Sequence, residues 1–205
     1  MKKVIAGLIL VCFASIHAWA EDPKTEAISS LSSAQTMIKQ GNVAKAVEEI
    51  NYALSKLNEV TAVEMLKFIP APPTGFKLDS KNSQGMGQGA MVMGNAGAEA
   101  EYSGAKDASV KLTIATGGVT GKMGSLASFG AMFAGVPQGA GGSKTVRIKG
   151  FTGTLQFDPN EKSGTLMLQV GEKTSVNIEG SGIASENILK SFAEKMDLNK
   201  LSTSF

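Results

Sequence analysis

Two stretches near the start of the chain place apolar residues at helical spacing. Asp22 and Pro23 open the first, an N-cap residue followed by the residue favoured at the first helical position. Its apolar positions are Ala27, Ile28, Leu31, Ala34 and Ile38. Gly41 ends this stretch and Asn42 caps the second, whose apolar positions are Val43, Ala46, Val47, Ile50, Ala53, Leu54 and Leu57. The pattern predicts a helical hairpin over 21–69 in which the two apolar stripes are hidden against each other.

Part of this pattern resembles a known type of hairpin. Gly41-Asn42, then Ala46, then Ala53-Leu54 is similar to a tetratricopeptide-type hairpin over about 40 residues. The resemblance implies a partner-binding unit. It occurs once, so we expect no solenoid, because each repeat of a solenoid buries its face on a neighbour. An ordinary helical hairpin is the alternative interpretation.

The period of the pattern changes after residues 70–75, where Pro70, Pro72 and Pro73 form a stiff linker. Seven segments then mostly alternate apolar and polar residues, as strands with one buried face do: Phe76–Leu78, Ala98–Tyr102, Val110–Ile114, Val146–Lys149, Thr154–Phe157, Leu166–Val170 and Val176–Glu179. Short connections at 158–164 and 171–173 predict antiparallel hairpins between the last three.

The end of the chain returns to helical spacing. Ser185 is a candidate N-cap for a closing helix, with a buried stripe at Ile188, Leu189, Phe192 and Met196. The expected fold class is α+β, an N-terminal helical hairpin followed by an antiparallel sheet of about six or seven strands covered by helices. The sheet domain spans 76–205.

A weaker helix is expected from Met123 to Phe133. With it, the order of sheet, inserted helix, three-strand meander and closing helix resembles the small α/β/α domain of the PsbP and Mog1 proteins. The resemblance lies in element order alone, over about 130 residues, and carries no diagnostic motif. It implies an accessory, partner-binding protein rather than an enzyme.

The first twenty residues have the composition of a secretory signal peptide. Lys2 and Lys3 precede an uncharged run over 4–14, and Ala18 and Ala20 place small residues three and one before a cut. We predict cleavage after Ala20, with an uncleaved anchor as the alternative. The bacterial periplasm is the expected location, and release outside the cell is the alternative.

Processing changes the composition in a way that bears on function. It removes Cys12, His17 and Trp19, which are the only Cys, His and Trp. It also removes two of the 20 basic residues, so 18 remain against 18 acidic ones. A neutral chain gives no reason to expect nucleic acid as a partner. No later segment is long and apolar enough to predict a membrane span.

Without histidine and cysteine, the mature chain excludes a Ser-His-Asp triad, a Cys nucleophile and the usual zinc sites. Two polar arrangements remain as candidates for catalytic groups. Ser103 and Lys106 have Ser-x-x-Lys spacing, but Ser103 falls at a strand end. Glu99 and Glu101 share one face of a strand, where a solvated surface is the simpler interpretation. We therefore predict a protein that is not an enzyme and needs no cofactor.

Methionines cluster in a glycine-rich segment. Met86, Met91 and Met93 lie within eight residues of one another. Thioethers are soft ligands that suit Cu(I) or Ag(I), so a metal-binding protein is an alternative function. Methionine is also a flexible filler of apolar cores, which is the competing interpretation.

Two Gly-Ala-Met segments echo each other and supply the candidate partner site. One carries Met91, Val92 and Met93, and the other carries Met132 and Phe133. Apolar side chains in glycine-rich segments either pack down as a flap or wait for a partner, and sizeable exposed apolar patches tend to be binding surfaces. Compositional bias in two loops is the competing interpretation of the echo. The preferred hypothesis is a non-enzymatic periplasmic accessory protein that binds another envelope protein. A lipid or small-ligand binder is a further alternative.

Overall fold

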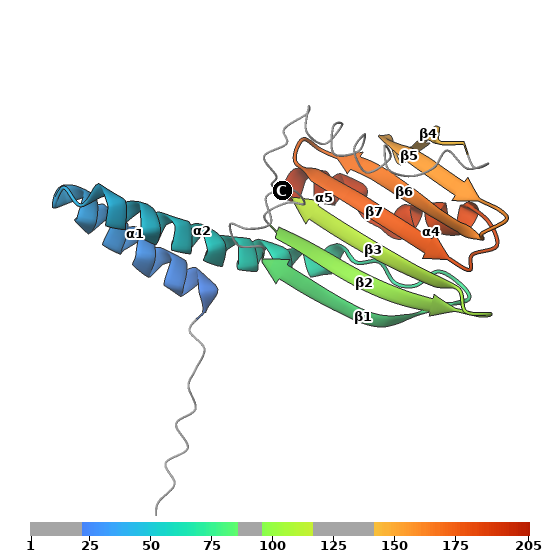
Figure 1. Cartoon of the computed structure of the whole chain (residues 1–205), viewed down its shortest axis with the longest axis horizontal. Coiled ribbons are helices and arrows are strands. Elements are labelled where there is room, and N and C mark those ends of the chain that lie inside the picture. Colours follow the sequence, from blue (N-terminus) through green and yellow to red (C-terminus); the bar gives the residue numbers. More distant parts are fainter. Residues whose placement is uncertain (1–21, 86–95, 117–141) are drawn as a thin grey trace, which may run out of the picture.

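The computed structural model describes residues 22–85, 96–116 and 142–205. Two long helices come first, α1 (Pro23–Lys39) and α2 (Val43–Met65), followed by a short 3-10 turn, η1 (Leu66–Phe68). A seven-stranded antiparallel sheet and two further helices, α4 (Asn187–Lys195) and α5 (Leu198–Ser204), complete the described part (Figure 1). The α+β prediction is confirmed.

The hairpin helices begin where the sequence predicts. The Asp22 carboxylate accepts a hydrogen bond from the backbone N–H of Lys24 at 3.4 Å. The Asn42 side chain accepts one from the N–H of Lys45 at 3.5 Å. Gly41 has a φ of 77°, a left-handed conformation that suits glycine, and it allows the chain to reverse between the helices. These caps satisfy backbone donors that the first turns leave without partners.

The strands confirm all seven alternating segments and extend each of them at one end or both. In spatial order they run β1-β2-β3-β7-β6-β5-β4, and every neighbouring pair is antiparallel. One predicted segment, Val146–Lys149, is one residue too long at its end. Its strand ends at Ile148, and Lys149 lies in the turn that follows, with a φ of 49°. We call the strands, together with α4 and α5, the sheet region. The strand bounds are β1 (Phe76–Gly85), β2 (Ala96–Gly104), β3 (Ser109–Thr116), β4 (Lys144–Ile148), β5 (Phe151–Asp158), β6 (Ser163–Val170) and β7 (Thr174–Ser181).

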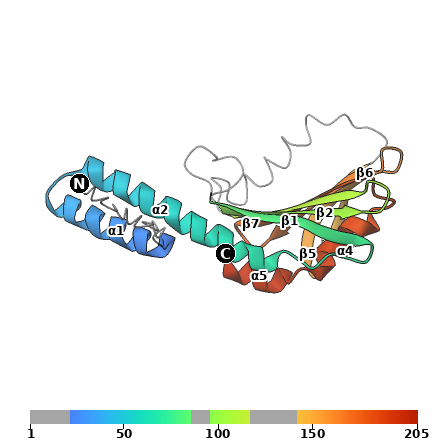
Figure 2. The ribbon, with the colours of Figure 1, turned by 90° about the horizontal axis from the view of Figure 1, so that it is seen from below.

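One face of the sheet carries the main core. Alternate residues of β3, β6 and β7 are fully buried there, among them Leu112, Leu166 and Ile178. The helices α4 and α5 cover this face (Figure 2). Phe192 of α4 packs edge-on against Tyr102, with ring centroids 4.7 Å apart.

The root of the hairpin takes part in the same core. Met65, the last residue of α2, is completely buried among the core residues of the sheet region. The Tyr102 hydroxyl donates a hydrogen bond to the carbonyl oxygen of Pro70 at 2.8 Å. The hairpin is therefore fixed at one end by buried contacts, and the remainder of it extends past the sheet (Figure 1).

The C-terminal part corrects one expectation and adds an element. The N-cap of α4 is Glu186 and not Ser185, and no side chain caps that helix. The predicted stripe is confirmed, since Leu189, Phe192 and Met196 are buried and Ile188 packs against the core. The sequence did not predict α5 as a separate helix, which the Asp197 side chain caps. The expected helix over 123–133 lies outside the described residues.

Among the described helices, none combines the length and apolar character needed to cross a membrane.

Candidate binding surface on the helical hairpin

Small side chains form the contact between α1 and α2. Ala27, Ser30 and Ala34 of α1 are buried, and so are Ala46 and Ala53 of α2. Alanine and serine fill little space, so the two helices pack closely along this seam. The seam therefore leaves no room for larger side chains between the helices.

The large aliphatic side chains of the hairpin point away from this seam. Nine of them are between 42% and 69% exposed. One of the nine, Val63, lies on the flank of α2 that carries Tyr52. We call the other eight the apolar face: Ile28, Leu31, Ile38, Val43, Val47, Ile50, Leu54 and Leu57. The prediction that the hairpin hides its apolar stripes is wrong for these residues. The helices use their alanine positions for mutual contact, and no described element covers the larger stripes.

A polar contact shows that both stripes lie on the same side of the hairpin. Glu26 of α1 accepts a hydrogen bond from the Tyr52 hydroxyl of α2 and pairs with Lys56 at 3.3 Å. Residues in a helix are about 100° apart, so Glu26 and Leu31 lie on opposite sides of the seam in α1. Tyr52 and Leu54 are related in the same way in α2. Because the flanks with Glu26 and Tyr52 meet, the flanks with Leu31 and Leu54 lie together on the other side.

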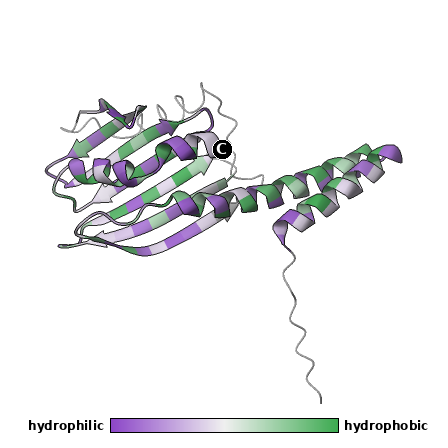
Figure 3. Ribbon diagram, turned by 180° about the vertical axis from the view of Figure 1, so that it is seen from behind, coloured by the Kyte–Doolittle hydropathy of each residue, from purple (hydrophilic) through white to green (hydrophobic). Residues whose placement is uncertain are grey.

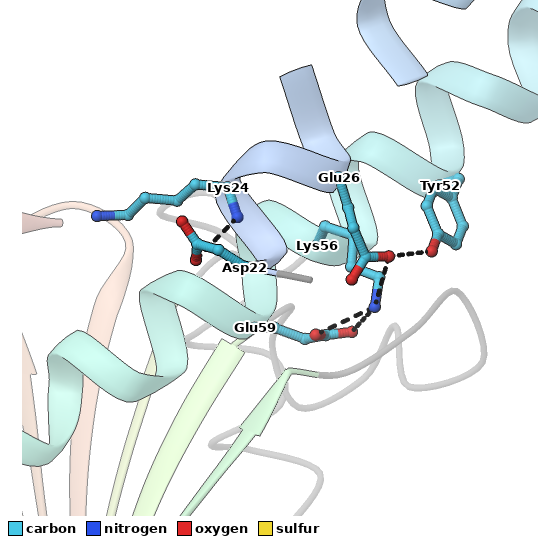
Figure 4. A network of polar contacts seen from close by, with 6 residues as sticks. All are labelled: Asp22, Lys24, Glu26, Tyr52, Lys56 and Glu59. Atoms are coloured by element: carbon cyan, nitrogen blue, oxygen red, sulfur yellow. Dashed lines mark hydrogen bonds and ion pairs between the residues drawn. The ribbon is translucent and has the colours of Figure 1, made fainter. Parts of the chain in front are cut away.

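The polar contacts form a small network opposite the apolar face (Figure 4). The hydrogen bond from Tyr52 is the main cause that holds the pKa of Glu26 below its usual value, and it raises the pKa of Tyr52. Lys56 also pairs with Glu59 at 3.5 Å and lies 5.5 Å from the centre of the Tyr52 ring. These contacts link the two helices to each other across the side that faces away from the apolar face.

Hydrophobic residues continue along the hairpin well beyond the end of the sheet, where Figure 3 shows them on both helices. The stripe of α2 is aliphatic at each of its five positions in the apolar face. The stripe of α1 contains one polar side chain, the exposed Gln35, between Leu31 and Ile38. Exposed apolar surface of this extent is typical of an interaction site.

A groove of about 560 Å³ lies at the root of the hairpin, between the end of α2 and α5. Apolar and charged side chains line it, and Phe68 meets Phe205 edge-on there with centroids 5.8 Å apart. Lys67 pairs with Glu64. The charged side chains of the groove are of both signs: Glu64, Lys67, Lys195, Asp197 and Lys200. This mixture of charges favours neither an anionic nor a cationic ligand.

The Ser-x-x-Lys spacing does not bring a serine and a lysine onto one helical turn. Ser103 lies in β2, and its hydroxyl donates to the Asp79 carboxylate at 3.0 Å. Lys106 lies in the turn that follows, with a φ of 58°. The arrangement differs from that of a Ser-Lys nucleophile pair, in which the lysine stands one helical turn from the serine.

The two carboxylates on β2 have surface partners. Glu99 pairs with Lys111 of β3 at 2.9 Å, and this contact is the main cause that raises the pKa of Lys111. Glu101 accepts a hydrogen bond from the Ser80 hydroxyl at 3.4 Å. Their positions are those of a solvated sheet face.

The site residues proposed from sequence fall outside the described part of the chain. This applies to the candidate partner-binding residues and to the candidate metal ligands alike: Met86, Met91, Val92, Met93, Met132 and Phe133. Their roles stay predictions. Within residues 22–85, 96–116 and 142–205, no group of three or more histidine, cysteine, aspartate or glutamate side chains is placed to hold a metal ion.

No family model matches the chain, and neither a curated protein nor a solved structure does. The likenesses to tetratricopeptide hairpins and to the PsbP and Mog1 domain stay predictions. The apolar face was missed by the sequence interpretation, although a signal for it exists. Each helix carries a stripe of alanine and serine beside a stripe of larger aliphatic residues, and only one stripe per helix can lie in the contact.

Proposed function

We propose that this chain is an exported, non-enzymatic binding protein of the cell envelope, and that the apolar face of the hairpin is where it docks a protein chain. The observation that carries the proposal is the exposure of eight large aliphatic side chains on one side of a projecting hairpin. Removing such side chains from water stabilises a complex by about 25 cal/mol per Å² of buried apolar area.

The way the hairpin is held supports a binding role. Its root is anchored in the core through Met65 and through the hydrogen bond from Tyr102 to Pro70. Along its length, the close alanine seam and the contacts of Glu26 keep the two helices together. A surface that is already ordered loses little conformational entropy when it binds.

Export is the second part of the proposal, and it rests on the signal-peptide pattern of residues 1–20. The intact mass of the protein recovered from the periplasm tests it. We expect a chain that begins at Glu21. Recovery of a chain that retains Met1, or that carries lipid on Cys12, would contradict this part of the proposal.

Site-specific photo-crosslinking tests the docking surface. A benzoylphenylalanine residue is placed at Leu54, within the apolar face, and separately at Glu48, which is exposed on the flank of α2 that carries Tyr52. The two positions share one helix and differ in the side to which they point. After irradiation in the periplasm, we expect a protein adduct from position 54 and little or none from position 48.

A second variant makes the result specific. Val47→Ser in the chain labelled at position 54 removes an aliphatic side chain two turns away on the same stripe, and it should reduce the yield of the adduct. Equal adducts from positions 48 and 54, or none from either position, would overturn the proposed function.

A further inference from the structure

We propose that the protein chain docked on the apolar face is a second copy of this chain, with two hairpins joining face to face in a four-helix bundle. This inference rests on the proposed function and names its partner. Four features support it: the spacing of the apolar residues, the polarity of their flanks, the size of the face and its position beyond the sheet.

The spacing on α2 indicates that the partner is helical. The apolar face advances along this helix in alternating steps of four and three residues, through Val43, Val47, Ile50, Leu54 and Leu57. A 3-4 repeat of apolar positions is the pattern by which helices pack side by side at a small angle, as in four-helix bundles. The helix therefore presents a bundle-type seam to the outside, in addition to the alanine seam toward α1.

The spacing on α1 follows the same rule with one polar member. Steps of three, four and three residues join Ile28, Leu31, Gln35 and Ile38. Gln35 is uncharged, and a single polar side chain in such a seam lowers stability while it fixes how the helices are aligned. Lys24, four residues before Ile28, continues the repeat at the start of the helix. Three of the four positions from Ile28 to Ile38 are aliphatic, so this helix extends the seam of α2, with Gln35 as the polar point in its middle.

The flanks of the face permit self-association. Most positions that border it on the outer side are uncharged, with Thr25 and Ser32 on α1 and Asn51 and Asn58 on α2. Lys39, at the end of α1, is charged. Two identical copies therefore bring no like charges together along the middle of these borders, whereas selective pairing with a different helix commonly uses charges there.

A membrane surface is a less suitable partner for this face. Interfacial helices are rich in lysine and arginine beside their apolar residues. On α1, the two lysines stand only at the ends of the helix, at Lys24 and Lys39. The middle of the face therefore lacks the cations that would hold it against anionic lipid.

The face is large enough for a dimer. The 17 residues of α1 extend over about 25 Å, and two helices side by side are about 20 Å wide. Two such faces pressed together bury on the order of 1,000 Å², the lower bound for a specific protein interface. Eight aliphatic side chains from each copy would form the core of the bundle.

The hairpin is placed so that another copy can reach it. Figures 1 and 2 show, from two directions, that most of α1 and the first half of α2 lie beyond the end of the sheet. Two hairpins can align while the two sheet regions remain apart. A two-fold axis through the bundle gives both copies the same contacts, which is the usual symmetry of homodimers.

The test is the mass of the mature chain in solution, measured by sedimentation over a range of concentrations. The wild-type chain should be a dimer. Ile50→Ser combined with Leu54→Ser should raise the dissociation constant at least tenfold, with an unchanged circular dichroism spectrum. The matched control is Lys45→Ser combined with Glu48→Ser, on the opposite flank of α2, which should remain as dimeric as the wild type.

Thiol crosslinking provides a second measurement, because the mature chain contains no cysteine of its own. We expect a short bismaleimide to join two chains that carry Leu54→Cys, and not two chains that carry Glu48→Cys. Crosslinking of both variants to the same extent would reflect random collision and would overturn the proposal.

The remaining outcomes separate this inference from the proposed function. A monomer at every concentration, with a photo-adduct from position 54 to a different protein, overturns the second copy and retains the proposed function. A monomer without any adduct overturns both. A monomer that floats with vesicles of phosphatidylethanolamine and phosphatidylglycerol, and loses this ability with Ile50→Ser and Leu54→Ser, assigns the face to lipid and also overturns both.

Discussion

The hairpin and the sheet region bury different kinds of side chain. In the sheet region, large residues such as Leu166 and Ile178 are completely buried, and α4 and α5 cover them. In the hairpin, alanines such as Ala53 are buried, while Ile28 is 69% exposed. Both parts contain enough aliphatic residues for a core. The difference is that only the sheet has a second layer to cover them.

This contrast explains why the hairpin is the better candidate for binding. A sheet with one apolar face needs no further partner to bury that face once helices cover it. Two helices alone can hide only one stripe each, so a second stripe stays in water until another element covers it. At the root, where α2 meets the sheet region, the arrangement changes and Met65 is buried. The uncovered surface thus begins where the hairpin leaves the sheet.

The largest expected effect comes from exchanging the same leucine for alanine in the two regions. Leu166→Ala removes a completely buried side chain and should lower the free energy of unfolding by about 2–5 kcal/mol. Leu54→Ala removes a side chain that is half exposed and should change it by no more than about 0.5 kcal/mol in dilute solution. Urea unfolding followed by circular dichroism measures both.

The pair is informative because the chemical change is identical and the surroundings differ. A loss of several kcal/mol from Leu54→Ala at low protein concentration would show that its side chain belongs to the core of the single chain. The contrast between the two regions would then be wrong, and so would the claim that the apolar face is an exposed surface for binding.

The fold could be predicted to a large extent because its signals are local. Asp22 before Pro23, and Asn42 after Gly41, mark helix starts that depend on a few neighbouring residues. Strand alternation is local in the same sense, and it located all seven strands. The separate helix α5 was missed because it is only seven residues long, too short for a clear helical period, and its cap, Asp197, directly follows the last residue of the α4 stripe.

The candidate site could not be predicted in the same way. Ala53 and Leu54 are neighbours with similar propensities, and helical periodicity alone does not decide which of them faces α1. Close packing of the backbones decided in favour of alanine, and this is a property of the pair of helices. The sequence interpretation assumed that the largest side chains are buried first, which holds for the sheet region and is wrong for the hairpin.

A smaller effect is expected where the two regions join. The buried Tyr102 hydroxyl donates to Pro70, next to the root of the hairpin. Tyr102→Phe leaves that carbonyl oxygen without this donor and should cost about 1–3 kcal/mol. Thermal unfolding at neutral pH measures the loss. An unchanged melting temperature would mean that this contact does not stabilise the junction.

The same residue predicts a loss of stability in alkali. Burial raises the pKa of Tyr102 from 10.0 to about 12. The folded chain therefore holds this proton over a range in which the unfolded chain releases it. The stabilisation is complete below pH 10 and is lost as the pH rises to 12, by about 2–3 kcal/mol at 1.36 kcal/mol per unit. Tyr102→Phe should lack this part of the pH dependence, while the lysines contribute equally to both proteins.

The smallest effect is expected on the polar side of the hairpin, opposite the apolar face. The hydrogen bond from Tyr52 is the main cause of the lowered pKa of Glu26, so Tyr52→Phe should move that pKa upward toward its ordinary value of 4.5. A carboxylate with a lowered pKa stabilises the folded chain above pH 4.5, and this contribution is lost as the pH falls through the lowered value. A carbon-detected NMR titration of the Glu26 carboxyl measures the shift in each protein.

Lys56 still pairs with Glu26 in the Tyr52→Phe variant, so part of the lowering of the Glu26 pKa should persist. If the two titration curves coincide, the Tyr52 contact does not exist in solution, and the placement of both apolar stripes on one side of the hairpin would rest on the contact between Lys56 and Glu26 alone.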